Sequence, residues 1–235
     1  MKNLLLLHGA IGAKDQLEPL KDILKNDFNV YSFNFSGHGK RSFSQNFDIE
    51  QFTKDTLSFM LSNKLSQVSI FGYSMGGYVA LNFAKNFPDK VAQIITLGTK
   101  FKWTPTIATK EVQLLNSELI EQKIPAFAKT LSNRHGTNNW KALLSKTAEM
   151  MLAMGEENPL SLLDYKTIKQ PCKLLLAEHD EMVSLEETLA VCNALPNSTF
   201  LRITNSKHPI EKVDLDELSK EIYYHNVISN AAKQN

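Results

Sequence analysis

The sequence predicts a doubly wound α/β protein with a mostly parallel, six-stranded sheet, and two observations carry this prediction. Short apolar runs alternate along the chain with helical segments, and such alternation implies right-handed parallel crossovers. The alternation stops over residues 102–167, where the pattern is helical throughout, and then resumes. We therefore expect an α/β core formed by residues 1–101 and 168–235, with residues 102–167 as a helical lid.

Length and charge limit what the protein can be. A chain of 235 residues can bury one sizeable core and is short for two independent domains. Lys and Arg number 26 against 25 Asp and Glu, so we expect a small-molecule substrate and no nucleic-acid partner, which would call for a basic field. The apolar run after Lys2 is shorter than a signal peptide's core and no segment is long enough to span a bilayer, so we expect a cytoplasmic protein with no membrane partner. The oligomeric state is left open.

The elements follow from local patterns. The wholly apolar run 4–7 is typical of a central strand buried on both faces. The elements expected next are a helix near 16–25, a strand at 28–35, a helix from the cap Asp48 to about 63, a strand at 67–71, a helix at 78–87 and a strand at 91–97. After the helical stretch we expect strands at 172–177 and 199–203, a helix at 184–195 and a last helix beginning at Pro209.

The segment 72–76 reads Gly-Tyr-Ser-Met-Gly and lies where the strand 67–71 turns into the helix 78–87. A serine in so tight a turn has strained dihedral angles, and Gly72 and Gly76 remove Cβ atoms that would collide. The turn lifts the hydroxyl clear of the sheet, and the first amides of the helix point toward an oxyanion formed there. Ser74 is therefore the predicted nucleophile, and the backbone N–H of Met75 is a predicted oxyanion donor.

This motif with its flanks resembles the nucleophile elbow of the α/β-hydrolase superfamily, and the resemblance extends over nearly the whole chain. It implies a catalytic triad in the chain order serine, acid, histidine, with each residue in a loop at the carboxyl end of a strand. It implies no cofactor and no metal, and the two cysteines, Cys172 and Cys192, form no metal-binding spacing. Compared with the usual eight-stranded plan, the amino-terminal pair of strands is absent, because the run 4–7 already stands before the oxyanion loop.

A serine hydroxyl needs an imidazole to accept its proton and a carboxylate to orient that imidazole. His208 fits the order, because it follows the last strand, and Pro209 holds it in an extended loop. The other histidines are excluded by position: His8 and His38 precede the serine, His135 lies in the lid, His179 precedes the acid and His225 lies in helix sequence.

The acid comes from the loop after the strand 172–177, since the loop after the strand 91–97 has no carboxylate. Glu178, Asp180 and Glu181 are all available there, and the family pattern of a small residue, two variable residues and an aspartate selects Asp180. Glu178 is the alternative. The second oxyanion donor is the backbone N–H of Ala10, because His8-Gly9-Ala10 resembles the family's oxyanion loop.

These features predict a serine hydrolase that cleaves a carboxylic ester, or alternatively a thioester, through an acyl-enzyme on Ser74. Apolar lid residues, among them Met151 and Met154, and the lack of a charge cluster in the strand-end loops other than the acid's own predict a small apolar acyl group. Two alternatives stay open. One is a carbon–carbon hydrolase, or a lyase like the menaquinone-pathway synthase of the superfamily, although Tyr78 stands where that synthase has an arginine. The other is a non-catalytic ligand-binding member of the same fold.

Overall fold

The computed structural model describes the backbone of residues 1–231 and the side chains of residues 1–226. Its strands are β1 (Lys2–Leu7), β2 (Phe28–Ser32), β3 (Val68–Tyr73), β4 (Val91–Leu97), β5 (Cys172–His179) and β6 (Ser198–Lys207). Its α-helices are α1 (Glu18–Leu24), α2 (Ile49–Ser62), α3 (Met75–Asn86), α4 (Pro105–Val112), α5 (Ser117–Lys123), α6 (Pro125–His135), α7 (Asn139–Glu156), α8 (Leu162–Tyr165), α9 (Leu185–Ala194) and α10 (Leu215–Ala231). Short 3₁₀ turns are η1 (Lys14–Leu17), η2 (Pro88–Lys90), η3 (Gln113–Leu115) and η4 (Ile210–Lys212).

The strands form one sheet in the order β2-β1-β3-β4-β5-β6, and every neighbouring pair is parallel. The predicted doubly wound, six-stranded α/β fold is therefore confirmed. β2 ends at Ser32, three residues before the predicted end. Beyond it Phe33 and Phe35 turn into the core, where Phe33 stacks on Phe59 at 4.7 Å and Phe35 lies 5.0 Å from Phe52, between ring centroids. Burial of these rings against α2 takes the place of further strand pairing.

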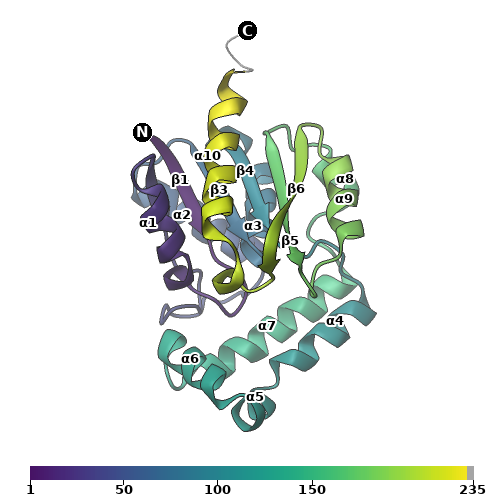
Figure 1. Cartoon of the computed structure of the whole chain (residues 1–235). Coiled ribbons are helices and arrows are strands. Elements are labelled where there is room, and N and C mark those ends of the chain that lie inside the picture. The colour runs from purple at the N-terminus through teal and green to yellow at the C-terminus, as the bar shows by residue number, and fades with distance from the viewer. Residues whose placement is uncertain (232–235) are drawn as a thin grey trace.

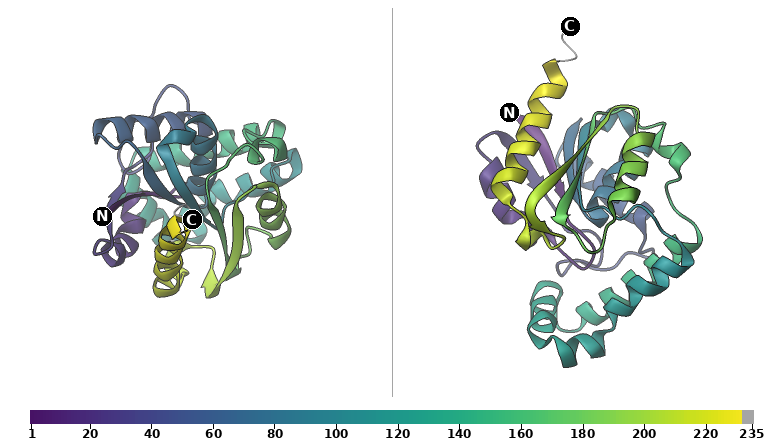
Figure 2. Two further views of the ribbon diagram at one scale, coloured as in Figure 1. Left: turned by 90° about the horizontal axis from the view of Figure 1, so that it is seen from above. Right: turned by 45° about the vertical axis from the view of Figure 1, so that its right-hand side comes forward.

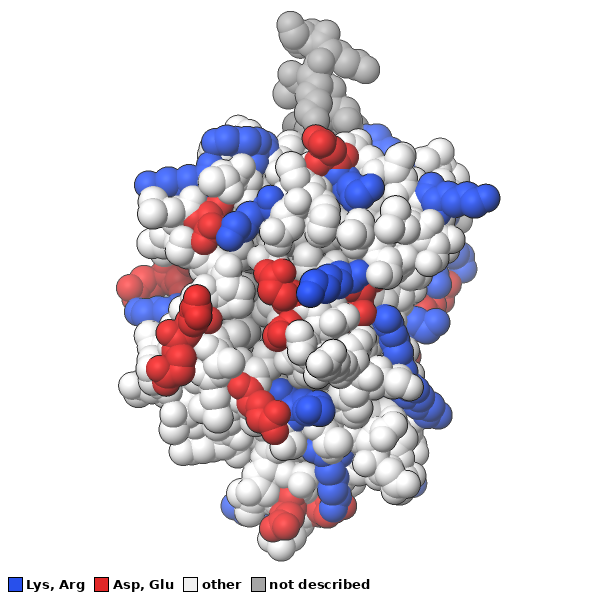
Figure 3. All heavy atoms as spheres, turned by 180° about the vertical axis from the view of Figure 1, so that it is seen from behind, with Lys and Arg blue, Asp and Glu red and all other residues white. Residues whose placement is uncertain are grey.

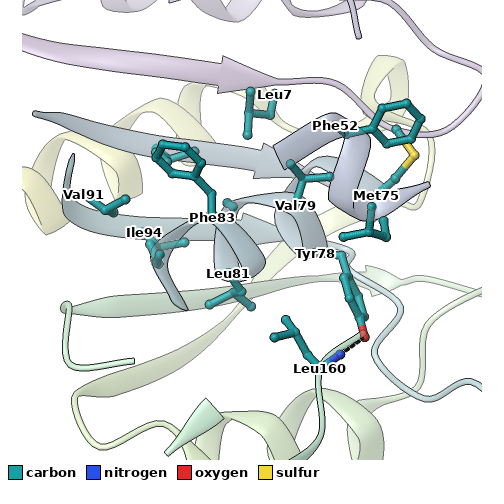
Figure 4. Packing of buried hydrophobic residues seen from close by; sticks show 14 of the residues in the cluster. Leu7, Phe52, Met75, Tyr78, Val79, Leu81, Phe83, Val91, Ile94 and Leu160 are labelled. Atoms are coloured by element: carbon teal, nitrogen blue, oxygen red, sulfur yellow. Dashed lines mark hydrogen bonds between the residues drawn. The ribbon is translucent and has the colours of Figure 1, made fainter. Parts of the chain in front are cut away.

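Helices cover both faces of the sheet (Figures 1 and 2). On one face, α1 and α10 pack against alternate residues of β1, as Leu4 and Leu6 share a cluster with Leu20 and Leu218. On the other face α2, α3, α8 and α9 enclose the larger cluster, to which β1 contributes its intervening leucines. Figure 4 shows part of this larger cluster around α3. With both faces buried, the strands need not alternate apolar with polar residues, which explains the continuous apolar run of β1.

Residues 102–167, named here the helical segment, connect β4 to β5. Within it α4 packs along α7, and α5 and α6 pack on each other. Figure 1 shows α4 to α7 as an arm beyond one end of the sheet. The segment has its own apolar cluster, centred on Leu131, Trp140 and Leu144, which is separate from the two clusters of the core. That it acts as a lid stays a prediction.

The last helix begins later than expected. Pro209 was predicted to start it, but the chain first makes the turn η4, and α10 begins at Leu215. The carboxylate of Asp214 accepts hydrogen bonds from the backbone N–H groups of Asp216 and Glu217, at 3.0 and 2.9 Å. Asp214 therefore caps the first turn of α10, a role that aspartate fills better than proline.

Of the helices within residues 1–231, none combines the length and the apolar character needed to cross a lipid bilayer. On the face shown in Figure 3 acidic and basic side chains are interspersed, and neither sign forms a continuous field.

Candidate active site

Ser74 joins β3 to α3 in a strained turn. Its backbone dihedral angles are φ 52° and ψ −119°, a conformation that residues other than glycine rarely adopt. Two hydrogen bonds to the backbone of Ser74 hold this turn. The Ser74 N–H donates to the carbonyl of Leu97 at 2.8 Å, and the Ser74 carbonyl accepts from the side-chain hydroxyl of Thr99 at 3.0 Å. The expected strand-to-helix elbow is therefore present around Ser74.

The two elbow glycines lie where a side chain has no room. A Cβ on Gly72 would overlap the backbone of Gly76, and a Cβ on Gly76 would lie 2.7 Å from the carbonyl oxygen of His8 and closer still to that of Leu7. Backbone atoms cannot move aside as the end of a flexible side chain can. Gly76 thus allows the elbow to approach the end of β1, from which the oxyanion loop continues.

Replacing Gly76 with valine is therefore expected to destabilise the fold by more than about 3 kcal/mol, at or beyond the usual cost of overpacking. The measurement is urea unfolding followed by circular dichroism. The control is Ala10→Val, which adds two methyl groups to an existing Cβ at a partly exposed position beside the elbow, whereas Gly76→Val adds the clashing Cβ as well. Equal unfolding midpoints for the two variants would contradict the steric account of Gly76.

Asp180 and His208 come together because of the register between β5 and β6. His179, the last residue of β5, pairs with Lys207, the last residue of β6. The residues that follow them in the chain, Asp180 and His208, therefore lie side by side. The His208 Nδ1 atom is 2.8 Å from Asp180 Oδ2. An ionised carboxylate only accepts, so Nδ1 carries the proton and Nε2 is left with a free lone pair.

The Asp180 carboxylate is held from two directions. Its side chain is 1% exposed, and Oδ1 accepts hydrogen bonds from the backbone N–H groups of Met182 and Val183, both at 2.9 Å. Burial raises the pKa of Asp180, but the hydrogen bonds from His208 and these amides outweigh it and lower the pKa below its ordinary value. The other two carboxylates of this loop lie elsewhere: Glu178 accepts from the Asn205 N–H at 2.9 Å, and Glu181 is exposed.

His208 has two further neighbours, one at its backbone carbonyl and one at its imidazole. The Tyr73 hydroxyl, from the residue before the elbow serine, donates to the His208 carbonyl at 3.0 Å. A Cβ built on Gly98 would lie 3.3 Å from His208 Nδ1 and 3.2 Å from Asp180 Oδ2. Gly98 lies in the loop after β4, which has no carboxylate, so a side chain at this position would lie directly beside the imidazole. The sequence interpretation did not include the contact of Tyr73, which no local pattern indicates.

Ala10 and Met75, the predicted oxyanion donors, both line a cavity with Ser74 and His208. Neither backbone N–H donates to another atom in the part of the chain that the structure describes. That both amides point into this cavity stays a prediction.

The other buried histidines are hydrogen-bonded within the fold. His8 accepts from the Phe35 N–H at 3.2 Å, and His38 Nδ1 lies 3.0 Å from the carbonyl oxygen of Ser36. Burial lowers the pKa of His8 to about 4, so its ring is neutral at neutral pH. These contacts give the two rings a structural role within the fold.

Ser74 and His208 line two cavities at once. The small cavity, of about 50 Å³, is walled by Met75, Met150, Met151, Met154 and Met182, which are five of the seven methionines in the sequence. The large cavity, of about 510 Å³, lies between the oxyanion loop, the helical segment and the residues that follow His208. Methionine side chains are flexible and polarizable, so the small cavity has an adaptable, largely apolar wall.

The wall of the small cavity also contains one charged pair. Lys100 Nζ lies 3.3 Å from Glu111 Oε1 and also donates to the Met182 carbonyl at 2.8 Å. The sequence alone places Lys100 in the loop after β4. Its partner Glu111 lies on α4, and the sequence does not indicate the direction of that helix. Each charge is matched by the other, so the wall carries no net charge.

Comparison with known proteins agrees with this geometry. The family model described as "alpha/beta hydrolase fold" matches residues 2–153. The chain is 24% identical over 154 residues to a "Probable alcohol acetyltransferase" of Wickerhamomyces anomalus, covering 65% of this chain and 43% of that protein. It is 32% identical over 94 residues to a pimeloyl-[acyl-carrier protein] methyl ester esterase of Neisseria meningitidis, covering 40% and 35%. The chain thus spans less than half the length of these two relatives.

A solved structure shows the same fold over the whole chain. A thermophilic esterase from Thermogutta terrifontis superposes with a TM-score of 0.77 at 19% identity, covering 97% of this chain and 90% of that one. With a family model that matches more than half of its residues and an elbow serine at the end of β3, this chain belongs to the α/β-hydrolase fold family.

Proposed function

We propose that the protein is a serine hydrolase that cleaves carboxylic esters of small apolar acyl groups through an acyl-enzyme on Ser74. The observation that carries this proposal is the hydrogen bond of 2.8 Å between His208 and Asp180, on a histidine that lines both cavities together with Ser74. The names of the two curated relatives, an acetyltransferase acting on an alcohol and a methyl ester esterase, both concern esters and support this class.

In this mechanism Asp180 holds the His208 Nδ1–H, and Nε2 accepts the proton of the Ser74 hydroxyl. Oγ attacks the ester carbonyl, and the oxyanion accepts hydrogen bonds from the Ala10 and Met75 amides. The tetrahedral intermediate collapses to the acyl-enzyme, and the leaving alkoxide takes the proton from Nε2. Water then gives its proton to Nε2 and attacks the acyl carbonyl. The second tetrahedral intermediate releases the acid, and Ser74 Oγ takes the proton back from Nε2.

The two cavities bind different parts of the substrate. The leaving oxygen must lie next to His208, and the large cavity continues along Pro209, Glu211 and Lys212, which follow that histidine. The leaving group therefore occupies the large cavity, and the acyl group occupies the small cavity on the Met75 side. The helical segment walls both cavities and acts as the lid over them.

The lyase alternative needs a cation for the substrate's carboxylate. Among the described residues, the wall of the small cavity offers no cation that is free of a partner. Tyr78, in the place of the synthase's arginine, is buried, and its hydroxyl accepts from the Leu160 N–H at 3.1 Å (Figure 4). Lys100 is already paired with Glu111. The wall of the small cavity therefore favours an uncharged acyl group.

A chain-length series of p-nitrophenyl esters tests the size of the acyl group. At about 10–15 Å³ for each water-sized group, the small cavity holds roughly three to five such groups. Each buried methylene contributes about 0.8 kcal/mol, so kcat/KM should rise roughly fourfold per carbon as far as butanoate or pentanoate and then fall. A maximum at sixteen carbons, or a strict requirement for a free carboxylate, would contradict the assignment.

A pair of variants tests which cavity takes the acyl group. Met154→Ala widens the small cavity alone and should move the acyl optimum to longer chains. Leu115→Ala widens the large cavity alone and should leave the acyl optimum in place while favouring bulkier alcohols. The reverse result would exchange the two assignments.

A further inference from the structure

The oxyanion loop contains a residue in an unfavourable conformation. Gly9 to Gly12 form a turn closed by the Gly12 N–H and the Gly9 carbonyl at 3.2 Å. Ile11, at the third position of this turn, has φ 50°. A positive φ at this position is usual for glycine or asparagine and is a strained outlier for a β-branched residue. Contacts from outside the turn must therefore hold Ile11 as it is.

Those contacts come from the helical segment. His135, the last residue of α6, has its Nε2 atom 2.9 Å from the Ile11 carbonyl oxygen. The Ile11 side chain packs against the apolar cluster of this segment, which includes Leu131 and Trp140. The carbonyl and the side chain of Ile11 are thus both held by the segment.

The tautomer of His135 is fixed by its second hydrogen-bond partner. Its Nδ1 atom accepts a hydrogen bond from the Gly39 N–H at 3.0 Å, so Nε2 carries the proton and donates to Ile11. The ring is completely buried, and this burial lowers the pKa of His135 to about 4. At neutral pH His135 is therefore a neutral ring with one donor and one acceptor, and both are used.

We propose that His135 is a positioning residue, which keeps the Ala10 amide in its oxyanion-binding direction by holding the carbonyl of Ile11. This inference rests on the proposed function of Ala10 and extends it to a residue of the helical segment that touches no substrate. Without the hydrogen bond, Ile11 can relax to a negative φ. Because the dihedral angles at the second and third positions of a turn change together, Ala10 then changes as well.

Two variants separate the two hydrogen bonds of His135. In His135→Gln the side-chain NH₂ reaches the place of Nε2 and can still donate to Ile11. In His135→Asn the side-chain oxygen takes the place of Nδ1 and can still accept from Gly39. Each variant loses one buried hydrogen bond, so similar decreases in melting temperature are expected, and stability alone predicts equal activities.

The proposal instead predicts unequal activities with p-nitrophenyl butanoate. Removal of a whole oxyanion donor costs about 10²–10³ in kcat, and a misdirected one should cost less, roughly 30-fold. His135→Asn should show this loss in kcat with KM nearly unchanged, whereas His135→Gln should stay within about threefold of the wild type. Asn133→Ala, at an exposed position of the same helix, is the control for damage to α6 and should match the wild type. Equal losses in the Asn and Gln variants, or a loss confined to KM, would overturn the proposal.

Hydrogen exchange of the peptide that contains Ile11 gives a readout independent of turnover. Exchange should be faster in His135→Asn and unchanged in His135→Gln, and equal exchange would also overturn the proposal. The Ser74→Ala variant shows whether a negative result comes from the proposed function or from the proposed role of His135. If the wild type is no faster than Ser74→Ala, the proposed function is wrong, and the exchange data still decide the role of His135.

Discussion

Replacing Ser74 with alanine is expected to lower kcat for ester hydrolysis by roughly a million-fold, by analogy with serine hydrolases that have lost their nucleophile. The fold should be unaffected, because alanine and serine tolerate the positive φ of the elbow about equally. The hydrogen bonds that the backbone of residue 74 makes with Leu97 and Thr99 also remain. The measurement is kcat with a short p-nitrophenyl ester, together with the melting temperature.

The control for this variant is Ser145→Ala, on an exposed turn of α7. Ser145 lines neither cavity, so removal of its hydroxyl should leave the activity at the wild-type level. Unchanged hydrolysis in Ser74→Ala would reject the proposed nucleophile, whatever the control shows.

The second large effect is expected at Asp180. Asp180→Asn should lower kcat by about 10⁴, as is seen when the orienting aspartate of a serine protease triad becomes asparagine. The asparagine has nearly the same shape, but its NH₂ group cannot accept the His208 Nδ1–H, and its oxygen is the sole acceptor for that proton and the two loop amides. The proton then shifts to Nε2, where it blocks the base. The measurement is kcat at neutral pH.

Glu178→Gln is the matched control, because it makes the same chemical change two residues away. Glu178 accepts from the backbone of Asn205 and is not hydrogen-bonded to His208, so its loss should change kcat by less than about threefold, in line with a surface substitution. The reverse ranking of the two variants would make Glu178 the orienting acid.

The sequence was sufficient for those parts of the fold and site that depend on local sterics. The elbow follows from glycines that any strand-to-helix turn of this kind needs, and β4 has its predicted bounds. The pairing of Asp180 with His208 was implied by the family's chain order and by its residue pattern before the aspartate. Both residues stand at the ends of strands that become neighbours.

Features that depend on the direction of distant helices could not be predicted. Glu111 meets Lys100, and His135 meets Ile11, because the helical segment folds back over the end of the sheet. No spacing in the sequence relates these partners. The position of His135 in the predicted lid excludes it from the triad, and nothing in the local sequence indicates what its ring contacts. The late start of α10 has a local cause in Asp214, which the stronger signal of Pro209 obscured.

The most direct test of the central claim is labelling with a fluorophosphonate, which reacts with a serine that is activated by a neighbouring base. The protein is incubated with the probe, its intact mass is measured, and the modified peptide is sequenced by mass spectrometry. We expect one phosphonyl group per chain, on Ser74, with no labelling of Ser74→Ala and strongly slowed labelling of Asp180→Asn. An unmodified wild-type protein that binds an ester tightly without cleaving it, or a label on another residue, would contradict the account.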